Sequence, residues 1–244
     1  MKTEAGMKGK YRGLGVKGWG LGVKGWGLGV RGFARQRRGG LGLCVVWLAA
    51  GTLLAADGPR LVFSKSFPNS VPPFMQVTVD QGGGVEYREA EDDDQPLKFQ
   101  LTPAETQAVF DLVAKVDYFK HPLESPLKVA FMGMKTFRWE NAAQKSEAKF
   151  NYSEDPNAQA LLDWCERMAE SAQHRMDVER AAKYDRLGVV KALTLLQSAM
   201  DRKRLVGMDQ FLPILDRISK NENYMHTARA QASEMAEAIR NSKP

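Results

Sequence analysis

Reactive and metal-binding side chains are scarce in this 244-residue chain, which has two cysteines and three histidines. Cys44 lies in an apolar N-terminal run, so Cys165 is the one cysteine beyond that run and has no partner for an intramolecular disulfide there. His121, His174 and His226 lie far apart in sequence, and none belongs to a metal-ligand motif such as H-E-x-x-H. The sequence also has no G-x-S-x-G elbow and no Walker loop. We therefore expect no cofactor and no resident metal, and we favour a non-catalytic function.

Long apolar runs are equally scarce, and the one long run that is apolar and without charge covers residues 41–56. It follows four arginines: Arg31, Arg35, Arg37 and Arg38. This layout predicts a signal peptide over 37–56, cleaved after Ala56 or after Gly51. Because a spanning helix needs about 20 apolar residues, an uncleaved N-terminal anchor is the alternative. The protein is thus expected to be exported, periplasmic or extracellular, or else held in the membrane by its N-terminus.

Residues 1–36 form a glycine-rich leader. The heptads GLGVKGW, GLGVKGW and GLGVRGF repeat over 13–33. Their glycines argue against a coiled coil. The leader is then a flexible basic arm, or it is not part of the protein. In the second case the start codon has been assigned too early, and a DNA repeat upstream of the gene has been included in the translation. We favour the second interpretation, in which translation begins at Val30 and the signal peptide has an ordinary length.

The positive charge of the chain belongs to this N-terminal part. The formal net charge is +6, but residues 1–56 hold ten basic residues and one acidic residue. The other 25 basic and 28 acidic residues give the remainder a charge of −3. A basic surface is the usual footprint of a nucleic-acid-binding protein, so we expect no nucleic-acid partner.

Residues 57–172 have patterns typical of an α+β domain. Strand patterns occur in six segments: 61–63, 75–79, 85–87, 97–99, 137–139 and 148–152. Residues 102–105 (TPAE) form a capping box with proline at the first helical position. Asp155 and Pro156 start a second helix whose apolar stripe includes Cys165, which we expect to pack rather than react. The predicted fold is an antiparallel sheet of hairpins covered by two helices.

Residues 173–244 are predicted to form a C-terminal helical unit. The polar stretch 173–186 continues the second helix, and about three amphipathic helices follow, around Leu193, Leu215 and Ala232. A stable helical array needs about three repeats, and only one helical hairpin is present. The unit is therefore expected to pack against the α+β domain or against a partner.

The order of elements over residues 60–172 resembles that of small exported bacterial domains of unknown function. Three segments carry the resemblance: Phe63-Ser64-Lys65-Ser66, Pro72-Pro73-Phe74 and the capping box at 102–105. In those domains a Ser-rich strand and a proline-containing loop precede a glycine hairpin and a capped helix. Their opening loop often holds cysteines, and the corresponding loop of this chain holds none. The resemblance implies an exported domain and supplies no activity.

The one dense acidic cluster lies at 89–94. Its candidate metal ligands are Glu91, Asp92, Asp93 and Asp94. The cluster lacks the D-x-D-x-D-G spacing of a calcium loop, so a solvated acidic loop is the favoured interpretation. The alternative function for the chain is an envelope enzyme, with a site assembled from scattered polar residues that include His121, Glu124 and this acidic loop.

Four aromatic residues flank loops: Phe67, Phe74, Tyr118 and Phe119. They could contact a partner, because stiff loops lose little entropy on binding. The other interpretation is that they pack beneath the loops.

We expect an exported bacterial cell-envelope protein that acts as a non-catalytic protein-binding or structural module. The expected partner is another envelope protein, or a second copy bound through the C-terminal helices. Membrane contact is expected only through residues 41–56, if they are retained.

Overall fold

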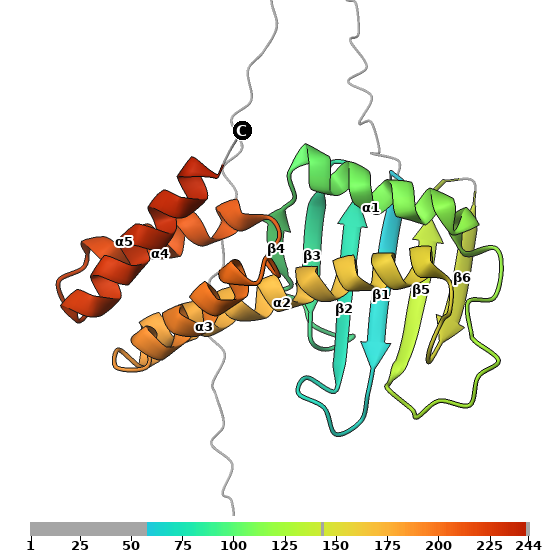
Figure 1. Cartoon of the computed structure of the whole chain (residues 1–244), viewed down its shortest axis with the longest axis horizontal. Coiled ribbons are helices and arrows are strands. Elements are labelled where there is room, and N and C mark those ends of the chain that lie inside the picture. Colours follow the sequence, from blue (N-terminus) through green and yellow to red (C-terminus); the bar gives the residue numbers. More distant parts are fainter. Residues whose placement is uncertain (1–57, 143, 243–244) are drawn as a thin grey trace, which may run out of the picture. The chain divides into compact units, whose positions relative to one another are not determined.

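The computed structural model describes residues 58–142 and 144–242. The predicted leader (1–36) and the signal or anchor (37–56) lie outside these residues. The described residues form a six-stranded sheet with two helices on one face, followed by three further helices (Figure 1). The predicted α+β class is thus confirmed. Over the same residues, no helix combines the length and apolar character needed to cross a bilayer.

All neighbouring strands of the sheet pair antiparallel, in the order β4-β3-β2-β1-β5-β6. The strands are β1 (Arg60–Ser66), β2 (Phe74–Asp80), β3 (Gly84–Arg88), β4 (Leu97–Gln100), β5 (Met134–Glu140) and β6 (Lys145–Phe150). Leu61 of β1 pairs with Val79 of β2 and with Trp139 of β5, so apolar side chains share one face. β1 becomes a central strand because the chain crosses from edge strand β4 to β5.

Helix α1 (Pro103–Lys115) makes this crossing and begins at the predicted capping box. Glu105 N–H donates to Thr102 Oγ1 at 3.2 Å, and Thr102 N–H donates to the Glu105 carboxylate at 2.8 Å. Val109 and Val113 are fully buried on the sheet side of the helix. The short helix η1 (Asp117–Phe119) follows.

Helix α2 (Pro156–Tyr184) lies on the same face of the sheet as α1 (Figure 1). Asp155 caps it by accepting the Asn157 N–H at 2.8 Å. Cys165 is fully buried in the core between these helices and the sheet, as predicted. The Phe137 ring lies at the centre of this core, with the rings of three other phenylalanines 5.2–5.5 Å away.

The opposite face of the sheet carries polar and charged side chains. Ion pairs connect neighbouring strands there, including Arg138 Nε with Glu147 at 3.0 Å and Lys98 with Glu86 at 2.7 Å. An antiparallel sheet with one packed face and one solvated face gives this alternation. Charges on the edge strands β4 and β6 also discourage pairing with a foreign strand.

The C-terminal helices enclose a second core. They are α3 (Val189–Asp201), η2 (Met208–Phe211), α4 (Leu212–Lys220) and α5 (His226–Asn241). Leu193, Leu215 and Ile239 are buried in this core, together with Val178 from the second half of α2. The polar stretch after residue 172 continues α2 to Tyr184, as predicted, so the predicted boundary at 172–173 falls within one helix.

The helical unit packs against the α+β part, the first of the two arrangements expected from the sequence. Ser171 is fully buried on α2, and its Oγ accepts the Val206 N–H at 2.9 Å. Gly207 N–H donates to the Glu105 carboxylate of α1 at 3.2 Å. Arg204 adds ion pairs to two carboxylates of α2. The segment before η2 is therefore attached to both covering helices.

Candidate functional site

Exposed apolar side chains lie at one end of the sheet, on the β1–β2 loop, on the loop before β5 and at the first residue of β5. We call them the loop surface, made of Val71, Leu127, Val129, Phe131, Met132 and Met134. Ser66, at the end of β1, pairs with both Phe74 and Met134, so the loops at this end adjoin one another (Figure 1). Val71 is 100% exposed and Phe131 is 55% exposed.

The β1–β2 loop is held in shape by hydrogen bonds. Phe67 N–H donates to Pro73 O at 2.9 Å and closes the loop. Ser70 Oγ lies within hydrogen-bonding distance of Phe67 O, at 2.7 Å, and of Pro72 O, at 2.6 Å. The Phe67 ring meets the Phe131 ring edge-on, with 5.9 Å between the centroids. The two loops therefore support one another.

The loop before β5 is anchored to the segment after β6. Met132 N–H donates to Asn151 Oδ1 at 2.7 Å, and Asn151 Nδ2 donates to Ala130 O at 3.0 Å. Gly133 has a φ of +92°, and a Cβ at that position would lie 2.9 Å from the Phe67 Cβ. Glycine is thus required where the two loops meet.

Exposed apolar side chains on hydrogen-bonded loops make this end of the sheet the candidate site. Fully burying one large aliphatic or aromatic side chain is worth about 1.5–3 kcal/mol. Loops that are already fixed lose little conformational entropy on binding. Lys128 is exposed among these residues, so the chemistry of the surface is apolar with a basic component.

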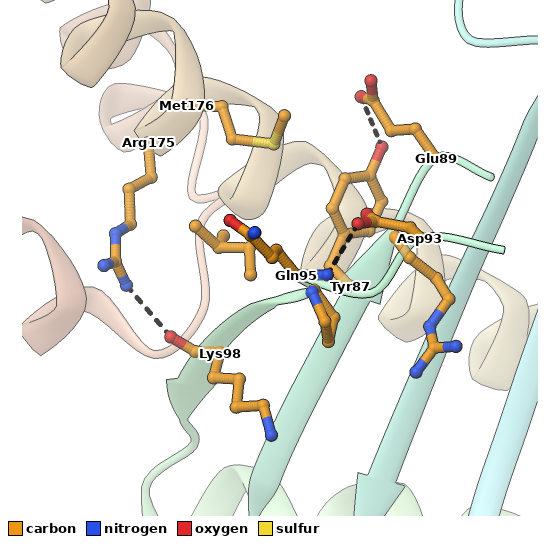
Figure 2. A pocket seen from close by; sticks show the side chains of 10 residues that line it. Tyr87, Glu89, Asp93, Gln95, Lys98, Arg175 and Met176 are labelled. Carbon is orange, nitrogen blue, oxygen red and sulfur yellow. Dashed lines mark hydrogen bonds between the residues drawn. The ribbon is translucent and has the colours of Figure 1, made fainter. Parts of the chain in front are cut away.

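An open pocket of about 450 Å³ lies between the β3–β4 loop and α2 (Figure 2). Tyr87 OH donates to Glu89 Oε1 at 3.0 Å and accepts from Gln173 Nε2 at 2.9 Å. Arg175 Nη1 donates to Lys98 O at 3.1 Å. Burial of the phenol, followed by the negative charge of Glu89, raises the pKa of Tyr87. These side chains hold one another in place, and the raised pKa disfavours Tyr87 as a base.

The structure separates the residues of the alternative enzyme site. The acidic loop 89–94 joins β3 to β4 at one edge of the sheet, whereas His121 and Glu124 follow η1, which packs on β5 and β6 at the other edge. The His121 side chain is 76% exposed, and its Nε2 lies 3.3 Å from Asp117 Oδ2. Glu124 accepts the backbone N–H of Asn151. His121 and the acidic loop therefore do not share one site.

The candidate metal ligands lie in the acidic loop. Glu91, Asp92 and Asp94 are exposed. Asp93 is half-buried, and its Oδ1 accepts the Gln95 N–H at 2.9 Å. Over residues 58–142 and 144–242, no three His, Cys, Asp or Glu side chains are grouped so that they could hold a metal ion.

The four loop aromatics chosen from the sequence have different environments. Phe119 is buried, and Tyr118 packs on Trp139 at 5.2 Å between ring centroids. Phe67 and Phe74 are half-buried.

Sequence reasoning missed the loop surface itself. The signal was available in residues 129–134 (VAFMGM), an apolar run that matches neither a predicted helix nor a predicted strand.

A second set of exposed apolar side chains lies on the helical unit. Tyr184 and Leu187 flank the α2–α3 turn and are 73% and 77% exposed. Leu195 on α3 and Met225 before α5 are also exposed. These four residues are the exposed large apolar side chains of the described part of the helical unit.

Comparison with known proteins makes no assignment for this site. No family model matches the chain, and no curated protein matches it. The choice of site therefore depends on the geometry described above.

Proposed function

We propose that this chain is an exported bacterial cell-envelope protein that binds another envelope protein through the loop surface, without a catalytic role. The observation that carries the proposal is the set of six exposed apolar side chains at one end of the sheet, five on two hydrogen-bonded loops and Met134 at the start of β5. The distance along the sheet between His121 and the acidic loop supports a non-catalytic role.

Affinity purification of the tagged, natively exported protein after mild cross-linking tests this proposal. The test variant is Val71→Asp with Phe131→Asp, and the matched control is Leu187→Asp with Leu195→Asp on the helical unit. We expect one stoichiometric envelope protein with the wild type and with the control, and its loss from the loop variant. Equal recovery from all three proteins would overturn the proposal. Circular-dichroism melting verifies that each variant is folded.

Self-association through the C-terminal helices is the second candidate, and the exposed Tyr184, Leu187 and Leu195 favour it. Light scattering of the wild type at micromolar concentration distinguishes the two. A dimer that Leu187→Asp with Leu195→Asp dissociates supports self-association. A monomer in both proteins eliminates it.

A further inference from the structure

Lys135 is a buried lysine that forms no ion pair with a carboxylate of the described residues. The alternation of β5 places it on the core face with Phe137 and Trp139, and the residue is 4% exposed. Its Nζ donates to Asn151 O at 2.7 Å and to Gly133 O at 3.3 Å. None of the ion pairs formed within residues 58–142 and 144–242 includes Lys135. Lysines are almost never fully buried unless they are paired, so a buried lysine whose acceptors are two backbone carbonyls is unusual.

A cavity of about 250 Å³ adjoins Lys135, between α2 and the ends of β1, β5 and β6. Its wall includes the charged Lys65, Lys135 and Glu166 and the apolar Met132, Phe150 and Leu162. Lys65 is the cross-strand neighbour of Lys135, and its Nζ lies 3.0 Å from Glu166 Oε1. The charges of Lys65 and Glu166 offset one another, which leaves the single positive charge of Lys135 beside the cavity.

We propose that this cavity binds a small organic monocarboxylate, with the carboxylate beside Lys135 and the apolar body against Met132, Phe150 and Leu162. The lysine has three N–H donors, and the two backbone carbonyls use two of them, so one is left for the ligand. The cavity volume of about 250 Å³ lies just below the range of about 300–1,000 Å³ that is usual for small-molecule sites. It therefore suits a small ligand such as hexanoate.

The electrostatics of the site agree with this assignment. Burial, followed by the charge of Lys65, lowers the pKa of Lys135, and the charges of Glu166 and Glu124 oppose this shift only in part. A bound carboxylate would restore the stability of the charged ammonium. A lysine that served only to hold the Gly133 and Asn151 backbones would bind no carboxylate, and this difference is measurable.

Calorimetric titration of the full chain with hexanoate, hexanol and hexylammonium separates the two roles. We expect binding of hexanoate alone. Lys135→Met should weaken this binding by about 10-fold or more, the effect of a lost hydrogen bond to a charged group. Glu166→Gln should strengthen it severalfold, because it removes a negative charge from the cavity wall. Lys128→Met, at an exposed lysine of the loop before β5, is the matched control and should bind hexanoate as the wild type does.

The proposal is overturned if hexanoate binds the wild type no more tightly than hexanol does, or if folded Lys135→Met binds it equally well. If Lys135→Met does not fold, Glu166→Gln decides the matter, since unchanged affinity contradicts the assignment. A short peptide ending in leucine, with a free or an amidated C-terminus, identifies the source of the carboxylate. Tighter binding of the free peptide than of hexanoate indicates a protein terminus, and the reverse indicates a free carboxylic acid. These outcomes do not depend on whether the loop surface binds a protein.

Discussion

Removing the Ser171 hydroxyl tests how the helical unit is attached to the α+β part. Ser171 Oγ accepts the Val206 N–H at 2.9 Å at a fully buried position. In Ser171→Ala this N–H loses its acceptor, and an unsatisfied buried donor costs about 1–3 kcal/mol. For a protein of this size, each kcal/mol lowers the melting temperature by about 2–4 °C. We therefore expect a decrease of about 2–12 °C.

Differential scanning calorimetry of the purified protein measures this decrease, with Thr194→Ala as the matched control. Thr194 Oγ1 donates to Val190 O at 2.9 Å, as Ser171 Oγ donates to Arg167 O at 2.8 Å, but Thr194 is exposed. Surface substitutions of this kind usually change the stability by less than about 0.5 kcal/mol. If Ser171→Ala melts at the same temperature as Thr194→Ala, the buried attachment has been assigned wrongly.

Three further predictions concern the core, the sheet surface and the buried thiol. Phe137→Ala should lower the free energy of unfolding by about 3–5 kcal/mol in urea titrations, because its ring packs on three others; a loss below 1 kcal/mol would contradict this packing. The hydrogen bond from Lys98 lowers the pKa of Glu86 from 4.5. The ion pair of Glu86 with Lys98 therefore stabilises the fold fully above pH 4.5, and this stabilisation is lost as the pH falls through the lowered pKa. The stability difference between wild type and Glu86→Gln, at most about 1 kcal/mol for a surface pair, should therefore shrink in acid, and a difference that grows would refute it. Burial raises the pKa of Cys165, so iodoacetamide at pH 8 should alkylate it only after unfolding, as peptide mapping would show.

Local sequence patterns predicted the elements better than their arrangement. The Thr102–Glu105 capping box and the alternation on either side of Gly82–Gly84 are local signals, and both are present in the structure. The central place of β1 depends on its pairing with β5, about 70 residues later in the chain. A local pattern does not specify such a non-local pairing.

The candidate sites were harder to predict for the same reason. The alternation of Lys135 with Phe137 and Trp139 would have placed the lysine on the core face. That Lys135 forms no ion pair with another described residue depends on Glu166, which lies on a different element and pairs with Lys65. Likewise, the exposure of Phe131 depends on how its loop is anchored by Asn151, a contact between distant segments.

Site-specific photo-cross-linking in cells tests the central claim most directly. A photoreactive phenylalanine analogue replaces Val71 on the loop surface or, as the control, Leu187 on the helical unit; both residues are exposed. Protein binding through the loop surface predicts a discrete adduct with a different envelope protein from position 71 and none from position 187. An adduct from position 187 alone, containing only two copies of this chain, would contradict the proposed function.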